Sequence, residues 1–481
     1  MLRHQCSSIL APIVVGIMAA GLLIWVFSQS VRYLQCASGV LLLVLIGAVI
    51  VHGRCWKVNG PINIKDFILT SYAIFLGLGM ISDCFRQDWQ FNDAVILLAY
   101  GGLLCFLFGF MLHSSRIASR PSRKPAFLLT SNQLFKLALL FFTVGFSFLF
   151  LEWRLFGHLQ SYSALTNAGF SIAVRPKPYI HTFTQLTGPG LLLALILLRR
   201  GTSPFRTCLL TCLAALTVAW YMFWGARINF AWLAMGILLV WREIPDRHGA
   251  SKIGLKPLAF ATLAIAAILV LSVIRTNWNF SKVRAEAPYG LGQQIQAGLD
   301  TYYQFRRTVE YFPRRADFLL GYSFYGIVAN PIPRALWPEK PVGAGRLASI
   351  LYDHNPDSTL GLSLPGELYA NFGIAGLLIG MFLYGMIAAG IYRWYNRQRG
   401  NPGALVVYIL LTEYMWFGIR GDLLDATSPI LYQLAPAALC FALVTAMNLR
   451  VSESNLRGGP VVRPRAEASF HHASLLMNPR R

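Results

Sequence analysis

The residues best suited to chemistry are arginines that alternate with aromatic side chains between positions 275 and 371. This segment holds ten basic residues, which are Arg275, Lys282, Arg284, Arg306, Arg307, Arg314, Arg315, Arg334, Lys340 and Arg346. A guanidinium group stays charged and offers a planar fork of donors that matches a phosphate. With aromatic neighbours such as Tyr303 and Trp337, the pattern indicates a site for a phosphate joined to a sugar. The alternative is a loop that neutralises lipid head groups and pairs with its own acids.

A metal centre is a weaker interpretation. Asp353, His354 and Asp357 lie close together in the sequence, and hard cations bind carboxylates. Their spacing matches no strong metal motif. The eight cysteines contain no Cys-x-x-Cys pair and fall mostly in or beside apolar runs. We therefore expect no metal, no cofactor and no disulfide framework.

The composition indicates which elements position these residues. Of 481 residues, 56% are hydrophobic and 13% are charged, whereas soluble proteins carry about 25% charged residues. This excludes an ordinary soluble enzyme, and the high hydrophobicity excludes a disordered chain. The net charge of +22 is compatible with nucleic-acid binding, but basic cytoplasmic loops of a membrane protein explain it more simply. We expect a lipid bilayer as partner and no nucleic acid.

Apolar runs long enough to cross a bilayer, about 17–25 residues, predict twelve transmembrane helices. They are 8–28, 37–52, 66–83, 93–112, 136–152, 181–198, 205–224, 227–241, 256–274, 372–392, 403–419 and 429–447. With both termini inside, 25 of the 42 Lys and Arg residues fall in inside segments, 7 in short outside segments and 10 in the long outside loop. This distribution favours cytoplasmic termini, because basic residues gather in cytoplasmic loops.

The predicted fold is therefore an all-α polytopic membrane protein with N-in and C-in topology. Residues 1–274 hold helices 1–9, a long helical outside loop of 275–371 lies between helices 9 and 10, and 372–447 hold helices 10–12. Residues 448–481 form a disordered cytoplasmic tail. Within the loop, 293–312 has the spacing of an amphipathic helix in the membrane interface. The apolar segment 318–333 either re-enters the membrane or caps a cavity.

Four local motifs resemble a known family. Residues 330–341 read NPIPRALWPEKP, and 366–376 read GELYANFGIAG at the entry to the last group of helices. Arg227 lies in the run FWGARINF, and 420–425 read RGDLLD. These motifs, the span count and the long outside loop resemble the bacterial O-antigen and oligosaccharide repeat-unit polymerases of the Wzy type.

The resemblance implies a membrane glycosyltransferase of GT-C-like, mostly helical architecture that needs no nucleotide sugar. Its substrates would be undecaprenyl-diphosphate-linked glycans at the periplasmic face of the bacterial inner membrane. The growing glycan leaves its lipid diphosphate and joins a hydroxyl of a new repeat unit. The resemblance leaves open whether a polysaccharide chain-length regulator is a further partner.

That chemistry assigns roles to the residues near the outer face. Cations stabilise the negative charge that develops on a leaving diphosphate. The candidate diphosphate ligands are Arg227, Arg275, Arg284, Arg334, Lys340 and Arg420. An acceptor hydroxyl needs a base, for which Glu367 is the first candidate and His354 the second, while Asp422 is placed to orient Arg420. The alternative for Glu367 is an acid that complements a helix N-terminus, and for each arginine it is an interfacial anchor.

Two other functions remain in competition. An O-antigen ligase would share the topology and the donor but transfer the glycan to lipid A core, and the His354-Asn355 pair resembles a pattern of such ligases. A transporter or flippase of lipid-linked glycans would carry charges along its spans and have short loops on both sides. The concentration of polar residues in one outside loop favours an enzyme over a transporter.

Overall fold

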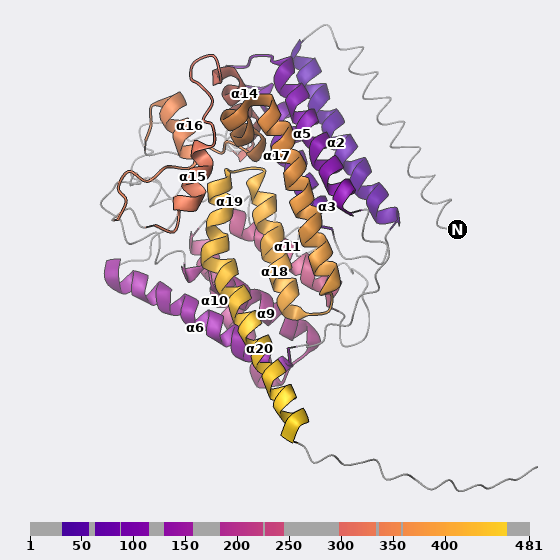
Figure 1. The fold of residues 1–481 in the computed structure, drawn as a ribbon, viewed down its shortest axis with the longest axis vertical. Helices are drawn as coiled ribbons and strands as arrows, with labels where there is room; N and C mark the ends of the chain where they lie inside the picture. Colours follow the sequence, from indigo (N-terminus) through magenta and orange to yellow (C-terminus); the bar gives the residue numbers. More distant parts are fainter. Residues whose placement is uncertain are drawn as a thin grey trace, which may run out of the picture.

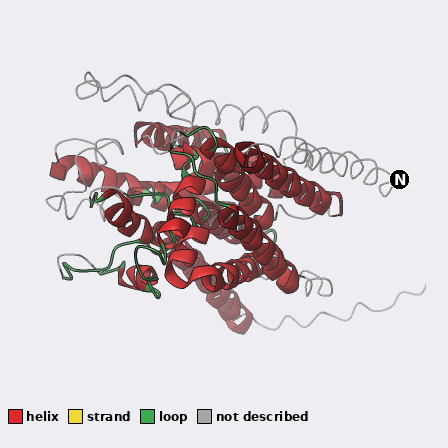
Figure 2. Cartoon of the chain, turned by 90° about the horizontal axis from the view of Figure 1, so that it is seen from above, coloured by secondary structure: helices red, strands yellow, loops and turns green. Residues whose placement is uncertain are grey.

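The structure is a computed structural model that describes residues 31–56, 63–86, 88–114, 129–156, 183–224, 227–244, 298–332, 336–356 and 359–458. Helices dominate these residues, and no strand occurs among them. Seen from above, the helices pack against one another, and the described loops gather mainly on one side (Figure 2). The predicted all-α class is thus confirmed for the part of the chain that is described.

The helices follow one another as α-helices with two π-helical insertions, η1 and η5. Their bounds are α2 (Val31–Trp56), α3 (Ile64–Tyr72), η1 (Ala73–Leu78), α4 (Gly79–Asp83), α5 (Asp93–Ser114), α6 (Ser131–Phe156), α9 (Thr187–Arg200), α10 (Pro204–Trp224), α11 (Arg227–Glu243), α14 (Thr301–Tyr311), α15 (Tyr322–Ala329), α16 (Ala344–Asp353), α17 (Leu364–Arg397), α18 (Pro402–Gly418), α19 (Leu423–Pro429), η5 (Ile430–Leu434) and α20 (Ala435–Gly458). The helices α3, η1 and α4 form one continuous rod, as do α19, η5 and α20.

Seven helical segments are long and apolar enough to cross a membrane. They are Arg32–Val51, Ile64–Asp83, Asp93–Ser114, Ser131–Leu155, Pro204–Tyr221, Leu364–Arg397 and Leu423–Met447. The apolar helix α18 is shorter, and α9 and α11 have 14 and 17 residues. Each of these ten coincides with a predicted span, whereas the predicted spans 8–28 and 256–274 lie outside the described residues. A polytopic membrane protein is confirmed; the count of twelve and the orientation of the termini remain predictions.

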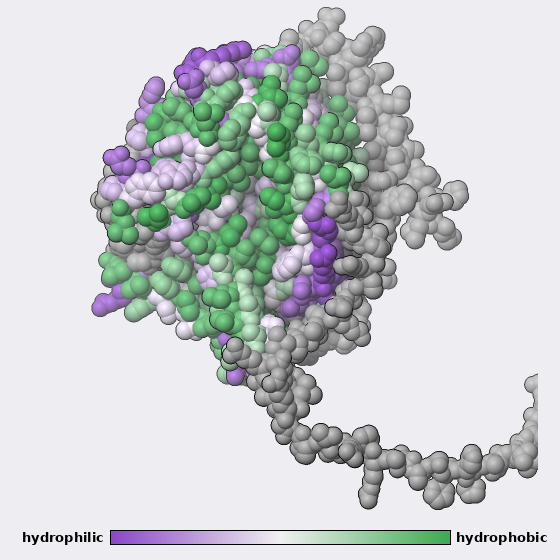
Figure 3. Space-filling view, viewed as in Figure 1, coloured by the Kyte–Doolittle hydropathy of each residue, from purple (hydrophilic) through white to green (hydrophobic). Residues whose placement is uncertain are grey.

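The outer surface of the bundle has the character of a lipid-facing protein. Along α5, for example, Leu97, Leu104 and Phe108 are 70%, 64% and 62% exposed. Apolar residues spread over the face shown in Figure 3, while hydrophilic residues gather mainly toward its ends. Helices that expose large apolar side chains in this way are stable in a bilayer, where the hydrocarbon chains replace a protein partner.

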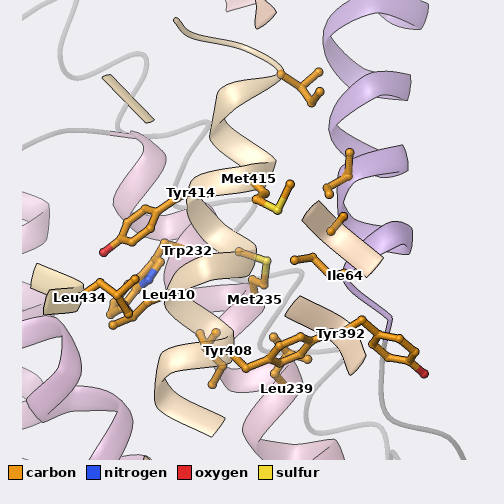
Figure 4. Close-up of a cluster of buried hydrophobic side chains, with 14 of the residues drawn as sticks. Ile64, Trp232, Met235, Leu239, Tyr392, Tyr408, Leu410, Tyr414, Met415 and Leu434 are labelled. Atoms are coloured by element: carbon orange, nitrogen blue, oxygen red, sulfur yellow. The ribbon is translucent and has the colours of Figure 1, made fainter. Parts of the chain in front are cut away.

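The helices also bury a continuous core. A close-up of part of it (Figure 4) shows Trp232 and Met235 of α11 beside Tyr414 and Met415 of α18. On the opposite side of α18, the hydroxyl of Ser71 donates to the carbonyl of Trp416 at 2.7 Å. The short helix α18 is therefore packed against α11 and bonded to α3, and these contacts fix the position of the turn that follows it.

The segment predicted as an outside loop is folded against one end of the bundle. The helices α14, α15 and α16 lie together there, above the start of α19 (Figure 1). The helix predicted over 293–312 is observed as α14, but Tyr302 and Phe305 are fully buried in the main core. The helix packs between α4, η1 and α17 instead of lying in the membrane interface, because its aromatic stripe finds protein partners.

Two boundaries differ from the predicted ones. Helix α17 begins at Leu364, before the predicted span 372–392, and bends at Phe372 and Gly373, where Gly373 has φ +65°. Ser363 accepts the Gly366 N–H, and Pro365 near the start favours a helix. At the C-terminus, α20 continues to Gly458, so the first part of the predicted tail is helical.

Candidate functional site

Glu367 lies in the first turns of α17 and is fully buried. One carboxylate oxygen accepts the hydroxyl of Ser323 on α15, and the other accepts the N–H of Leu423 at the start of α19, each at 2.6 Å. Asn371, one turn further along α17, donates to Ser323 Oγ at 2.8 Å. The predicted base is thus a buried carboxylate with both oxygens occupied by donors from two other helices.

Asp422 is the N-cap of α19, where its Oδ1 accepts the N–H of Asp425 at 2.8 Å. Its Oδ2 accepts the N–H of Gly345 in the first turn of α16 at 2.7 Å. The carboxylate therefore accepts hydrogen bonds at the N-terminal ends of two helices, α16 and α19, where the helix dipole favours a negative charge. Burial raises the pKa of Asp422, and the N–H of Gly345 opposes that rise. The expected contact with Arg420 is replaced by these backbone contacts.

Arg420 occupies the turn between α18 and α19. Its guanidinium carbon lies 5.6 Å from the centre of the Phe75 ring on η1. It forms no hydrogen bond or salt bridge with any residue that the structure describes. Partly buried and without such a partner, the guanidinium is available to an anion.

Asp300, which precedes α14, faces this arginine and was not among the predicted site residues. Burial raises the pKa of the Asp300 carboxyl, and the positive charges of Arg420 and Arg86 oppose the rise. The sequence carries no motif around Asp300. The one sequence signal for Asp300 is its position in the predicted amphipathic segment, five residues before Phe305, which suggests the start of a helix.

A second group of arginines surrounds Tyr303 on α14. The guanidinium carbon of Arg86 lies 3.6 Å from the ring centre, and that of Arg307 lies 5.6 Å away. The Tyr303 hydroxyl donates to Asp88 at 2.6 Å, and Arg307 pairs with Asp353 at 2.7 Å. These arginines are largely occupied by neighbouring acids, and for Arg307 and Asp353 this is the pairing within the loop that the alternative interpretation predicted.

A buried ion pair fixes α14 to the bundle. Arg306 lies 3.2 Å from Asp83 at the end of α4, and both side chains are almost fully buried. Gln35 of α2 also donates to Asp83, at 3.0 Å. Removal of one partner of a buried pair is strongly destabilising. Arg306 therefore fixes α14 to the bundle instead of binding substrate.

The other predicted residues are distributed as follows. Lys340 is 7% exposed and donates to the carbonyls of Asn330 and Ile332 at 2.8 and 3.1 Å, so its ammonium group holds a loop. His354 is exposed and ends α16 in the left-handed conformation, with φ +51°. Arg227 is the first residue of α11, but its side chain is not described. Arg275, Arg284 and Arg334 lie outside the described residues.

Among the residues described, no group of three or more His, Cys, Asp and Glu side chains is placed to hold a metal ion. The described site thus consists of the Arg420 guanidinium, the carboxyl groups of Asp300 and Asp425 within reach of its charge, and the buried carboxylates of Glu367 and Asp422 that bind the start of α19. Asp300, Asp425, Ser323, Asn371 and Gly345 are the members that were missed. Asn371 had a signal, because it lies one helical turn after Glu367 within the quoted GELYANFG run.

These features define a multi-pass membrane protein with a polar, arginine-containing site at one end of its helical bundle. A family model described as O-antigen polysaccharide polymerase Wzy matches residues 9–450, nearly the whole chain. The chain belongs to this family, as its motifs predicted. Membership supports a glycosyltransferase-type polymerase that acts on O-antigen repeat units. No curated protein and no solved structure matches the chain.

Proposed function

We propose that this protein polymerises lipid-diphosphate-linked repeat units at the periplasmic face of the bacterial inner membrane. The observation that carries the proposal is the family match over residues 9–450. Arg420, which forms no hydrogen bond or salt bridge with a described residue, supports the detailed reaction, because a diphosphate is bound by guanidinium N–H groups that are not already occupied. The donor is the growing glycan on undecaprenyl diphosphate, and the acceptor is a hydroxyl of the next repeat unit.

In this reaction the bond between the sugar C1 and the diphosphate oxygen breaks, and C1 bonds to the acceptor oxygen. The bonding electrons leave with the diphosphate, where Arg420 stabilises the added negative charge. Fixed cations and dipoles at a developing charge are often the largest single contribution to catalysis. Arg227, Arg275, Arg284 and Arg334 remain further candidates for the same diphosphate.

The acceptor hydroxyl must give its proton to a group that substrate can reach. Glu367 and Asp422 are 0% and 2% exposed, and both accept hydrogen bonds from the protein itself. Asp300 faces Arg420, and His354 is exposed. We therefore assign proton acceptance to Asp300, with His354 as the second candidate. A carboxyl whose pKa is raised is a stronger base than an ordinary one.

Separate Asp300→Asn and His354→Gln variants test this assignment. A general base works only when deprotonated, so the rate rises with pH through its pKa. Asp300→Asn is expected to lower kcat by about 10²–10⁴-fold and to remove that rising limb, whereas His354→Gln keeps it. The measurement is kcat/KM against pH with purified lipid-linked repeat units. A rising limb that disappears only in His354→Gln would reverse the assignment.

The orientation of the bundle rests on where its charges lie. Asp83 pairs with Arg306 of α14 at one end of the bundle, whereas Arg399, just after α17, pairs with Glu243 at the end of α11 at 3.0 Å. The second end holds helix termini rich in arginine, including Arg199 and Arg200 of α9. Basic residues favour the cytoplasmic side, so these termini support the proposal that the α14 end faces the periplasm.

The whole proposal is tested by deleting the gene and resolving the surface glycans by size. Loss of the ladder with retention of single-repeat material is the expected result, and the wild-type gene should restore the ladder. Loss of the single capped repeat as well, with lipid-linked glycan on the periplasmic face, would indicate a ligase. Accumulation of that glycan on the cytoplasmic face would indicate a flippase and would overturn the proposal.

A further inference from the structure

We infer that Glu367 and Asp422 are positioning residues that hold the turn bearing Arg420 in place. This inference rests on the proposed function, since it takes Arg420 as the ligand of the diphosphate. It assigns to Glu367 a task different from proton transfer. It also gives a reason for Ser323, Asn371 and Gly345 to lie where they do.

The first step concerns the turn itself, Ile419–Asp422, which joins α18 to α19. The N–H groups of Arg420 and Gly421 both bond to the carbonyl of Phe417 at 2.9 Å. On the far side of the turn, the Leu423 N–H bonds to Glu367. The backbone on either side of the Arg420 side chain is therefore fixed, and Glu367 supplies one of the two attachments.

The second step concerns the other oxygen of Glu367. It receives the hydroxyl of Ser323, which in turn accepts a hydrogen bond from Asn371. The Asn371 Oδ1 accepts the N–H of Gly321 at 3.0 Å, and the backbone N–H of Leu320 bonds to the Asn371 carbonyl at 3.0 Å. Glu367 thus connects the start of α15 with the start of α19 through a network whose central side chains, Glu367, Ser323 and Asn371, are fully buried.

The third step concerns Asp422, which ties the same turn to α16. A Cβ on Gly343 would lie 2.7 Å from Asp422 Oδ2, and a Cβ on Gly345 would lie 2.3 Å from the Leu360 carbonyl. These close approaches explain the glycines in the sequence PVGAGR. The turn is consequently held against α16 directly through Asp422, and against α15 through Glu367 and Ser323.

Neither carboxylate forms a salt bridge with a described residue; backbone N–H groups and one hydroxyl stabilise them instead. Partners of this kind fix a geometry, because each carboxylate oxygen is directed at a particular atom. A proton acceptor, in contrast, needs a free oxygen facing the substrate. The arrangement of Glu367 and Asp422 is that of a support for Arg420.

A double-mutant cycle between Glu367→Gln and Arg420→Lys tests the inference. Gln keeps the size of the side chain but cannot accept both donors. In an otherwise wild-type protein, Glu367→Gln is expected to lower kcat/KM about 30-fold. In a protein that already carries Arg420→Lys, the same substitution should lower kcat/KM by about threefold or less, because the effects of residues that act as a unit are not additive. Glu243→Gln is the matched control. Glu243 also accepts two hydrogen bonds, from Tyr395 and Arg399 at the opposite end of the bundle, and its effect should be the same in both backgrounds.

The inference would be overturned if the fold-losses in kcat/KM of the two single variants multiply in the double variant. If the rising limb of the pH profile also disappears in Glu367→Gln, Glu367 is the base. Unchanged kcat/KM in Arg420→Lys and in Arg420→Ala would instead refute the proposed function at that residue. If Glu367→Gln fails to fold, Ser323→Ala replaces it in the cycle, since it removes only the hydroxyl between Glu367 and Asn371.

Discussion

Replacing Arg420 with alanine is expected to lower kcat by about 10²–10³-fold while leaving the amount of folded protein unchanged. Loss of one preorganised group that stabilises developing charge costs this much in other enzymes. The fold should tolerate the change, because the guanidinium forms no hydrogen bond or salt bridge with a described residue and lies near the ring of Phe75. The measurement is glycan chain growth from purified lipid-linked repeat units in proteoliposomes.

Arg399→Ala is the control for Arg420→Ala. Arg399 pairs with Glu243 at the far end of the bundle, so its loss removes the same charge without touching the site. The Arg399 side chain is 40% exposed and the Glu243 side chain 2%, so activity is compared per amount of folded protein and should stay within about a factor of two. Equal activity of the two variants would show that Arg420 does not contact the diphosphate.

The fold was predictable to the extent that it follows from hydropathy. Each of the ten predicted spans that the structure describes coincides with a helix, because a bilayer demands continuous apolar runs and internally satisfied backbone groups. The early start of α17 was harder to foresee. The run SLPGELYANFG contains its cap and proline, but the bend at Gly373 depends on a backbone angle that the sequence alone does not specify.

The site was predictable in its types of residue and not in its contacts. The motifs indicated Glu367, Asp422 and Arg420 separately, and the structure brings Glu367 to the start of α19, beside Asp422. Their partners Ser323 and Gly345 are 44 and 77 positions away along the chain. Contacts over such separations depend on how helices pack, and a local pattern carries no information about them. For the same reason Lys340, a good phosphate ligand by type, is occupied by two carbonyls.

The closest helix contact in the membrane part gives the second large expected effect. Helices α5 and α17 cross where Gly109 faces Phe382 and Gly385 faces Phe106. A Cβ on either glycine would lie 2.1 Å from the opposite backbone carbonyl oxygen. Small residues at membrane helix crossings permit such close approach. Helix α17 also carries Glu367 and Asn371, so this crossing sets the depth and the tilt of the site.

Gly385→Ala is expected to cost about 3 kcal/mol or more, because the added methyl group meets rigid backbone and the helices must separate. Gly390→Ala is the matched control on the same helix, where a Cβ would meet only His113 Nε2, at 3.9 Å. There the higher helix propensity of alanine should leave stability unchanged or raised by about 0.5–1 kcal/mol. The measurement is the thermal midpoint of monodisperse protein in detergent, followed by size-exclusion chromatography. Equal midpoints for the two variants would mean that α5 and α17 do not cross at these glycines, and the placement of Glu367 beside α15 and α19 would then lose its support.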